Sequence, residues 1–339
     1  MKNLSIFDRA IFIINSFVAL IFTVSLLIPY INPSVFPYLS IFGLFFPVLI
    51  LLNICFVIYW VIKFKKQFLL SFLILLIGSE SLLSFISFSK DYEITSENKI
   101  SLISYNVRLF NIYNWSENNN VINEIQDFLN GEKVDIICLQ EYQNSTNILE
   151  EYPFRYENVR GNNLKYGQAI FSKYPIINNQ SLNFNSGSNN AIFSDIIIKN
   201  DTIRVYNIHL ESFSFGKEIS FSDINTDNEK LVRTLSSTFI EQQKQVEQLK
   251  SSIAKSPYKV VLSGDFNNTA FSYVYKELSR GLKDSFREKG NGFGITFNYN
   301  LNPMRIDFIL VDNSFQVSDF KTYNVNFSDH YPIYSEFYH

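Results

Sequence analysis

The sequence has little cysteine and little histidine. Only two cysteines occur among its 339 residues. Cys55 lies in an apolar run and Cys138 in an expected core strand, and the two are not spaced as metal ligands are. We therefore expect neither a disulfide between them nor a cysteine-based metal site. Because the chain has only three histidines, any chemistry that needs an imidazole depends on very few positions.

Charge is nearly absent from the first 88 residues, and this absence marks a boundary in the chain. The charged residues of this part are Lys2, Asp8, Arg9, Lys63, Lys65, Lys66 and Glu80, which sum to +3. Subtracting this from the whole chain's −3 leaves −6 for the remainder. A net acidic domain has no general attraction for polyanions. The composition therefore argues against a tight nucleic-acid binder.

Three long apolar segments fill this uncharged part, at about residues 10–30, 38–62 and 68–88. Each is close to the roughly 20 residues that a helix needs to cross a bilayer. The first is too long, and too plainly followed by others, to be a cleaved signal peptide. We therefore expect a membrane anchor of three transmembrane helices in residues 1–90, followed by a polar linker at residues 91–99.

The basic residues indicate how this anchor is oriented. Lys2 and Arg9 flank the first segment, and the lysines at 63, 65 and 66 separate the second from the third, whereas residues 31–37 carry no charge. The positive-inside rule places the N-terminus and the lysine loop in the cytoplasm. We expect a multi-pass protein of a bacterial inner membrane, with the rest of the chain on the periplasmic or extracytoplasmic side.

One acidic residue, Glu80, lies inside the third apolar segment. Ionisable groups within a membrane are candidates for a functional role. Because Glu80 is flanked by Ser79 and Ser81, a protonated and hydrogen-bonded packing residue is an equal reading. Both interpretations stay open.

After the linker, strand and helix patterns alternate along the chain. We expect strands at residues 100–106, 134–139, 168–172, 191–198, 202–209 and 305–311, near residues 260–262 and after residue 330, helices at 121–129, 229–255 and 273–278, and loops at 178–190 and 213–228. Interleaved strands and helices are typical of a mixed α/β domain. We expect this domain to occupy residues 100–339.

Polar side chains stand at the ends of five of these strands. They are Asn106, Glu141, His209, Asp265 with Asn267, and Asp329 with His330. Asp265 and Asn267 lie two residues apart, so in an extended segment both project to the same side. A carboxylate and an amide on one side suit a hard cation or a phosphate oxygen. Each motif alone is also typical of an ordinary turn, but the five together predict one shared polar site.

The order of the motifs SYNVR, LQEY, GQAIFSKYPI, YNIHLES, LSGDFNN, RIDFILV and SDHYPI resembles the endonuclease/exonuclease/phosphatase superfamily. Its members include pancreatic-type deoxyribonuclease, abasic-site endonucleases, neutral sphingomyelinases and inositol polyphosphate 5-phosphatases. The resemblance covers about residues 100–337. It implies a four-layered α/β/β/α sandwich with two mixed sheets, which hydrolyses phosphoric ester bonds with Mg²⁺ or Mn²⁺.

The resemblance also implies metal ligands. Glu141 would be the principal ligand, with Asn106 close by and Asp329 as a further metal or phosphate-site carboxylate. Such oxygen donors suit Mg²⁺ or Mn²⁺ rather than zinc, which prefers histidine and cysteine.

The remaining motif residues take catalytic and substrate-binding roles by the same resemblance. His330 would be the general base that activates water, with Asp307 accepting its other ring N–H. Asp265 would position the attacking water, and Asn267 would donate to the phosphate. His209 would donate to a phosphate oxygen or act near the leaving group. The pancreatic-type nucleases have an acidic partner for this first histidine, but residues 165–168 contain none.

These observations predict a membrane-anchored, metal-dependent phosphodiesterase of nuclease type. Two alternatives stay open: a lipid or small-molecule phosphoesterase of the sphingomyelinase or inositol-phosphatase type, and a non-catalytic membrane scaffold that kept the fold. The expected partners are a phosphoester substrate (nucleic acid, lipid or small molecule) and the lipid bilayer. No protein partner is inferred.

Overall fold

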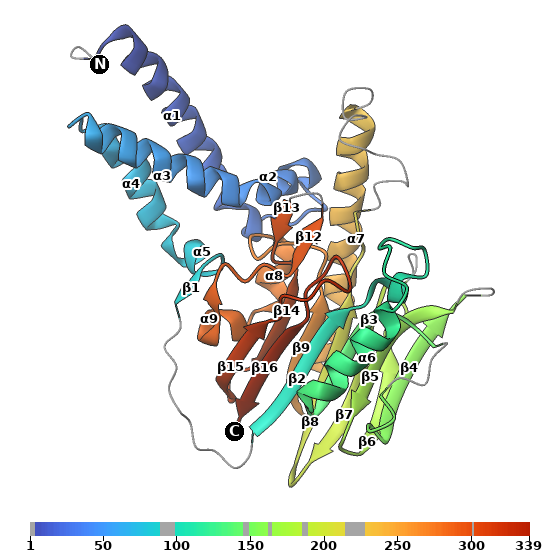
Figure 1. The fold of residues 1–339 in the computed structure, drawn as a ribbon. Helices are drawn as coiled ribbons and strands as arrows, with labels where there is room; N and C mark the ends of the chain where they lie inside the picture. The colour runs from blue at the N-terminus through green and yellow to red at the C-terminus, as the bar shows by residue number, and fades with distance from the viewer. Residues whose placement is uncertain are drawn as a thin grey trace.

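The computed structural model describes residues 4–88, 99–144, 149–161, 165–184, 189–213, 228–299 and 302–339. A helical N-terminal region is followed by an α/β domain with two mixed sheets (Figure 1). The linker expected at residues 91–99 lies outside the described residues except for Lys99, and the loop expected at 213–228 does so except for its two ends.

The N-terminal region has one helix that is long and apolar enough to cross a bilayer by itself. Helix α1 (Ile6–Ser25) continues into η1 (Ile28–Tyr30), so that this apolar stretch is 25 residues long. The next apolar stretch contains η2 (Pro37–Ser40), α2 (Ile41–Leu44) and α3 (Phe46–Ile62), and is bent by 57°. The bend follows from Pro47 in the first turn of α3, because proline cannot continue the preceding helix.

The third apolar segment does not form the full-length transmembrane helix that we expected. Helix α4 (Phe68–Ile77) has 10 residues, which span about 15 Å, or half of a typical hydrocarbon core. It ends at Gly78, where a Cβ atom would come within 3.1 Å of the Phe22 ring, and α5 (Ser79–Leu83) follows. Within the described residues there is thus one candidate span, or two if the bent pair counts as one. The expectation of three spans is not met.

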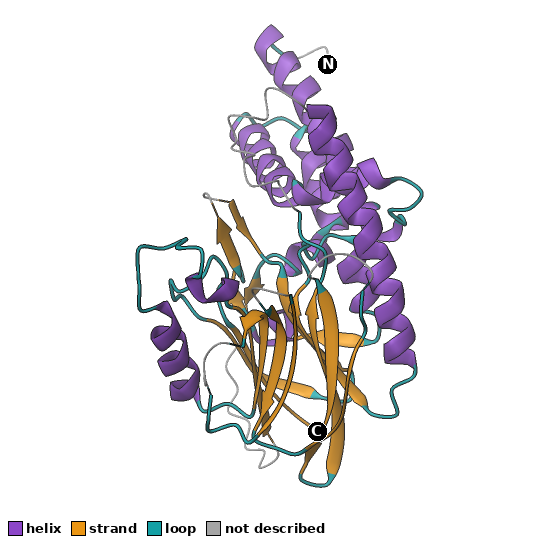
Figure 2. Cartoon of the chain, turned by 90° about the vertical axis from the view of Figure 1, so that its right-hand side faces the viewer, coloured by secondary structure: helices purple, strands orange, loops and turns teal. Residues whose placement is uncertain are grey.

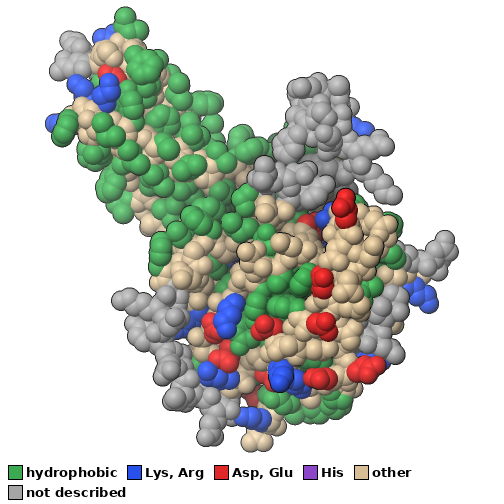
Figure 3. All heavy atoms as spheres, in the orientation of Figure 1, with side chains coloured by type: hydrophobic (Ala, Val, Ile, Leu, Met, Phe, Trp, Pro, Cys, Tyr) green, Lys and Arg blue, Asp and Glu red, His purple; other side chains and the backbone are tan. Residues whose placement is uncertain are grey.

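The surface of this helical region is largely apolar (Figure 3). Large apolar side chains that are more than half exposed include Ile6, Phe7, Ile14, Phe17, Leu20, Leu51 and Ile58. The polar end of the bundle is the one far from the α/β domain, where Lys63 Nζ lies 3.6 Å from Asp8 Oδ1. Exposed apolar patches of this kind mark surfaces that contact a membrane or another protein.

Each of the two large sheets has six strands. One has the order β10 (Leu282–Asp284), β14 (Asp307–Asp312), β9 (Lys259–Asp265), β8 (Asp201–His209), β7 (Asn190–Ile198) and β6 (Ile176–Ser181). The other has the order β15 (Gln316–Thr322), β16 (Ile333–Tyr338), β2 (Lys99–Asn106), β3 (Ile136–Gln143), β5 (Tyr166–Ser172) and β4 (Phe154–Arg160). The pairs β8–β9 and β2–β3 are parallel and the others antiparallel.

Three apolar clusters hold the α/β domain together. The first joins residues of both sheets, such as Leu102 and Ile136 with Val205 and Ile309. The second packs α7 (Asn228–Ala254) and α8 (Tyr273–Leu278) against the β9 sheet, and the third packs α6 (Val121–Glu132) against the β2 sheet. Figure 2 shows helices on either flank of the strands. The shared first cluster brings the ends of the two sheets close together.

Several short elements were not expected from the sequence. They are β1 (Ser87–Phe88) paired with β11 (Asn291–Gly292), the hairpin of β12 (Phe297–Tyr299) and β13 (Asn302–Met304), the helix α9 (Ser285–Lys289) and the turn η3 (Arg108–Asn111). In addition, residues 178–181 belong to β6 rather than to the loop expected there. Polar, asparagine-rich sequence can form a strand when, as here, it lies at a sheet edge.

The strand that leads into the polar site depends on one glycine. Gly264 has φ +133°, and a Cβ atom there would lie 2.0 Å from the carbonyl oxygen of Ile208 on the neighbouring strand. We expect Gly264→Ala to lower the free energy of unfolding by at least about 2 kcal/mol, because both the backbone conformation and the strand contact exclude a side chain. Urea unfolding of the full chain in detergent measures this.

Gly131 provides the matched control. It lies in α6, and a Cβ atom there would meet nothing within 4 Å. Gly131→Ala should leave stability unchanged or raise it by about 0.5–1 kcal/mol. Equal unfolding midpoints for the two variants would contradict the role assigned to Gly264.

Candidate active site

Three adjacent strands of one sheet each place a polar residue of the site at the same edge, β8 and β9 with their last residues and β14 with its first. In the register of the sheet, Asp265 of β9 pairs with Asp307 of β14 on one side and with His209 of β8 on the other. All three side chains are at least nine-tenths buried. Because neighbouring strands lie about 4.8 Å apart, this register alone gathers two carboxylates and an imidazole.

The second sheet contributes Asn106 and Glu141. Asn106 is the last residue of β2, and Glu141 follows Gln140 in β3, where the pairing with β5 shifts by one residue. Glu141 is the extra residue of this bulge and has φ +49°. Bulges re-aim side chains next to active sites, and a positive φ in a residue other than glycine is strain that the surrounding fold must support.

His330 enters the site from the segment that precedes β16. Its backbone makes an isolated bridge with Phe297, whose ring centroid lies 4.8 Å from that of the imidazole. Its N–H donates to Ser328 Oγ, and that hydroxyl in turn donates to the carbonyl of Asn106. The imidazole is thus held by contacts to both the β12 hairpin and the end of β2.

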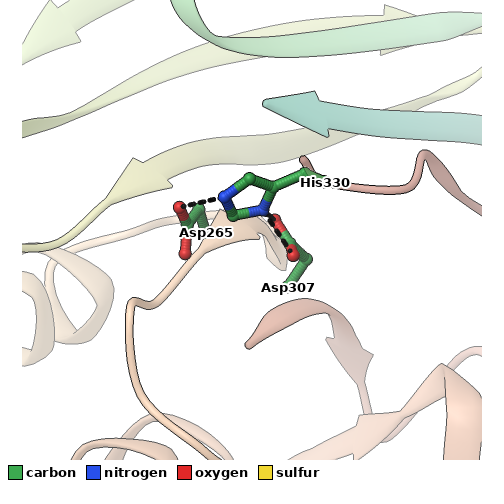
Figure 4. Close-up of side chains that lie close together, drawn as sticks. All are labelled: Asp265, Asp307 and His330. Carbon is green, nitrogen blue, oxygen red and sulfur yellow. Dashed lines mark hydrogen bonds and ion pairs between the residues drawn. The ribbon is translucent and has the colours of Figure 1, made fainter. Parts of the chain in front are cut away.

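Among the described residues, Asp265, Asp307 and His330 form a compact buried group of possible metal ligands (Figure 4). His330 Nδ1 lies 3.0 Å and 3.2 Å from the two carboxylate oxygens of Asp307. On the other side of the ring, Nε2 lies 3.6 Å from Asp265 Oδ2. The imidazole therefore stands between two buried carboxylates, with its Nδ1 directed at Asp307.

The other polar residues surround Asp265. The amide of Asn106 donates to Asp265 Oδ2 at 3.1 Å and more weakly to Glu141 Oε1 at 3.5 Å. His209 Nε2 lies 3.7 Å from Asp265 Oδ2 and 3.9 Å from Glu141 Oε1. His209, for which the sequence indicated no partner, thus faces two carboxylates. The structure brings six of the predicted site residues together: Asn106, Glu141, His209, Asp265, Asp307 and His330.

Burial and neighbouring charges shift the pKa values of these groups. Burial raises the pKa of Asp265 to about 6 against the opposing effect of His330, and burial also raises the pKa of Glu141. Burial lowers the pKa of His209 and favours its neutral form. Burial would lower the pKa of His330 as well, but the carboxylates of Asp307 and Asp265 outweigh it and raise that pKa to about 10. Perturbed carboxylates and imidazoles in one cluster are typical of a functional site.

Two predicted site residues lie at the edge of this group. Asp329 Oδ2 pairs with the Arg108 guanidinium at 3.1 Å, and the charge of Asp329 also acts to raise the pKa values of Glu141 and His330. The side-chain amide of Asn267 donates to the carbonyl of Leu210, and its backbone N–H donates to Asp265 Oδ1. Asn267 has φ +47°, so it is held in a left-handed turn beside Asp265.

Arg108 is a site residue that the sequence reasoning missed. Its backbone N–H donates to Asn106 Oδ1, and its guanidinium lies 4.2 Å from the Trp115 ring centroid. Residues 108–111 all have positive φ. A cavity of about 230 Å³ opens here, and Arg108, Trp115, Asn298 and Asp329 are among the residues that line it. The motif SYNVR contained the signal, since it places a basic residue two positions after Asn106.

The amides Gln140, Gln168 and Asn207 were also missed. Gln140 donates to Asn207 Oδ1, and Gln168 donates to the carbonyl of Asn207. Asn207 donates to the carbonyls of Leu139 and Ala169 in the opposite sheet. These bonds tie the two sheets together directly below the site. No sequence pattern distinguishes such linking amides from exposed ones.

The donor set of the site suits a hard divalent cation. The carboxylates of Glu141, Asp265 and Asp307 are oxygen donors, and Mg²⁺ and Mn²⁺ prefer such ligands. Both cysteines are free and neither belongs to the cluster. In this arrangement Asn106 presents its amide nitrogen to the carboxylates while its oxygen accepts from Arg108, so a ligand role for that oxygen requires the amide to turn.

Two sheets joined by one core, with buried carboxylates and imidazoles where their ends meet, form an arrangement that suits hydrolysis of phosphoric esters with a bound divalent cation. Residues 103–330 match the model of the Endonuclease/Exonuclease/phosphatase family. The chain belongs to this family, whose enzymes generally use divalent metals. Residues 8–85 match a separate domain of unknown function. A search of curated proteins found no match.

Solved structures share this fold. An endonuclease/exonuclease/phosphatase from Beutenbergia cavernae DSM 12333 aligns with a TM-score of 0.54 and 13% identity over 71% of this chain and 72% of its own. A family protein from Leptotrichia buccalis C-1013-b aligns with a TM-score of 0.51 and 17% identity, over 71% of this chain and 100% of its own. D. rerio TDP2, solved in complex with a single-strand DNA product, aligns with a TM-score of 0.54 and 16% identity, over 71% of this chain and 99% of its own. At these identities the likeness concerns the fold.

Proposed function

We propose that this protein is a membrane-anchored, divalent-metal-dependent phosphodiesterase whose catalytic centre is the group around Asp265. The observation that carries the proposal is His330 between two buried carboxylates, beside Glu141, where the ends of two sheets meet. In the reaction, water attacks phosphorus, the bond from phosphorus to the leaving oxygen breaks, and that oxygen takes up a proton. The anchor comprises residues 1–90, and the catalytic domain comprises residues 100–339 as a four-layered α/β/β/α sandwich.

Contacts in the site support the proposed roles. Glu141 would hold Mg²⁺ or Mn²⁺ with Asn106 close by, and Asp329 would be a further carboxylate at the rim. A bound divalent cation polarises a phosphoryl oxygen and offsets charge that develops in the transition state. Asn267 and Arg108 stand where they can donate to the phosphate or to the part of the substrate that occupies the adjoining cavity.

The residues around the His330 imidazole have separate roles in moving protons and in orienting the groups that move them. His330 acts as general base through Nε2, while Asp307 holds the Nδ1 side of the ring and fixes its orientation. Asp265 lies 3.6 Å from Nε2, so one water that lies beside the two groups can hydrogen-bond to both of them. His209, kept neutral by burial, donates to a phosphate oxygen or acts near the leaving group.

Hydrolysis of bis-p-nitrophenyl phosphate by the full chain in detergent tests this function. We expect release of p-nitrophenolate with Mg²⁺ or Mn²⁺, loss of release with EDTA, and recovery when the cation is restored. Absence of hydrolysis with either cation, in a protein that binds Mn²⁺ and unfolds cooperatively, would overturn the proposed phosphodiesterase.

Membrane anchoring rests on α1 and on the apolar surface around it (Figure 3). Because the basic residues gather at the end of the bundle far from the catalytic domain, the positive-inside rule places that domain outside the cytoplasm. An alkaline phosphatase fused to the C-terminus should therefore be active in a bacterial host. A stable but inactive fusion would reverse this orientation, with a fusion of known periplasmic location as the control.

A further inference from the structure

The loop that carries part of the catalytic site also forms part of the core of the helical region. This loop comprises residues 266–272, between β9 and α8. Phe271 is buried in a cluster with Val18, Phe22 and Phe46 of the helical region. Its ring stacks on that of Phe46, with centroids 4.2 Å apart and planes at 20°. The position of the loop beside Asp265 is therefore tied to the position of the apolar helices.

The catalytic domain lies at one end of the apolar helices. Phe22 lies three residues before Ser25, the last residue of α1, so it is about 4.5 Å along the helix axis from the end of α1. Tyr30 and Tyr38 lie at the end of the helices nearest the domain, and their side chains are 69% and 58% exposed. Tyrosines are enriched where membrane helices meet the membrane surface. Lys276 of α8 lies 4.9 Å from the Tyr30 ring centroid. In Figure 1 the hairpin of β12 and β13, which contacts His330 through Phe297, also lies at this end of the sheets.

The catalytic groups lie only a short distance along the chain from Phe271. Four residues separate Asn267 from Phe271, and such a segment spans at most about 14 Å when fully extended. The headgroup layer on each side of a bilayer is about 5–8 Å thick. Asn267 therefore lies within about 14 Å of Phe271, a reach that is longer than the thickness of the headgroup layer.

We infer that the substrate of this site is a phosphoester borne by a lipid of the same bilayer that holds the helical region. The inference rests on the proposed function and adds its substrate class. A site tied to the bundle by Phe271 meets phosphates in the headgroup layer at a high effective concentration, whereas the net charge of −6 outside the first 88 residues gives no attraction for a soluble polyanion.

Two matched probes test the inference with the full chain reconstituted in phosphatidylcholine vesicles. Hexadecyl p-nitrophenyl phosphate resides in the bilayer, whereas butyl p-nitrophenyl phosphate stays in water, and both contain the same scissile bond. At equal total concentration with Mg²⁺, we expect the hexadecyl probe to be hydrolysed at least about tenfold faster. The rate of p-nitrophenolate release is the measurement.

The outcomes separate this inference from the function on which it rests. If the butyl probe is hydrolysed as fast as the hexadecyl probe or faster, the substrate class is wrong while the phosphodiesterase stands. If neither probe is hydrolysed, and bis-p-nitrophenyl phosphate is not either, the proposed function fails as well. Preference for the hexadecyl probe supports the inference.

A pair of variants tests the coupling through Phe271. Phe271→Ala should reduce the preference for the hexadecyl probe by at least about threefold while the butyl rate is kept, because the loop loses its contact with Phe46. Phe271→Met retains an apolar side chain of similar size and should keep the preference. An unchanged preference in an alanine variant that unfolds cooperatively would remove Phe271 from the inference. If the alanine variant does not fold, the ratio of the hexadecyl rate to the butyl rate in the wild type decides whether the substrate is a lipid phosphoester.

Discussion

Replacing His330 with alanine should lower the turnover of bis-p-nitrophenyl phosphate by about 10² or more, the usual contribution of a positioned general base. The imidazole is buried, with Nδ1 3.0 Å from Asp307 Oδ2 and Nε2 3.6 Å from Asp265 Oδ2. No other imidazole in the described part of the chain makes these two contacts. The loss should therefore appear in kcat. Steady-state kinetics at saturating Mg²⁺ measure it.

His339→Ala is the matched control for this substitution. The third histidine is exposed at the end of the chain, and its ring contacts Phe315 outside the site. Its removal should leave turnover unchanged. Turnover of His330→Ala within about twofold of the wild type, in a protein of normal stability, would exclude His330 as the base.

The pH profile distinguishes a base from a cationic hydrogen-bond donor at His330. Without a divalent cation, the carboxylates of Asp307 and Asp265 outweigh burial and raise the pKa of His330 to about 10, so the ring is protonated at pH 7. A base must be neutral, and hence activity should rise with pH through the pKa of the loaded enzyme and then level off. A rate that instead falls as pH rises through this range would assign His330 as a charged donor to the phosphate. A shift of the rising limb to lower pH in Asp307→Asn would confirm the partnership, because the Asp307 carboxylate raises the pKa of His330.

Glu141→Gln should have the second large effect, through metal binding. The substitution keeps the shape of the side chain but removes the negative charge of the proposed principal ligand. We expect turnover at 1 equivalent of Mn²⁺ to fall by about 10² or more, since each carboxylate contributes strongly to holding a hard cation. Higher Mn²⁺ concentrations should restore part of the rate. Titration of Mn²⁺ by electron paramagnetic resonance measures binding independently of activity.

Glu150→Gln supplies the control for charge alone. Glu150 is exposed and lies within the turn in which the backbone N–H of Tyr152 donates to the carbonyl of Leu149. Its neutralisation should change neither Mn²⁺ binding nor turnover. If Glu141→Gln binds Mn²⁺ as tightly as the wild type, Glu141 is not the principal ligand, and the carboxylates of Asp265 and Asp307 become the candidates.

Local sequence patterns were sufficient for most strands and helices of the α/β domain. The apolar runs at 134–139 and 202–209 correspond to β3 and β8, because buried strands need continuous or alternating apolar residues. The short edge elements carry no such pattern, since a strand such as β6 is paired on one side and largely exposed. Its residues therefore read as a loop.

The helical region shows the same limit. Composition indicated the apolar segments, but helix length depends on where packing interrupts them. Gly78 brings α4 against the Phe22 ring and ends the helix there, and Pro47 bends the second segment. An average of hydropathy over a window does not detect such positions. The count of apolar residues therefore predicted more full-length transmembrane helices than the structure has within its described residues.

By itself, the sequence determined the family and the chemical nature of the candidate site residues, because these depend on residue types in a fixed order along the chain. Only the tertiary structure decided which of those residues meet. The register of β8, β9 and β14 places Asp265 between His209 and Asp307, a bulge turns Glu141 toward them, and Asp329 pairs with Arg108 instead. The packing of Phe271 against the apolar helices was likewise visible only in the tertiary structure. Contacts between residues far apart in the chain depend on strand register and on packing, and neither leaves a periodic signal in sequence.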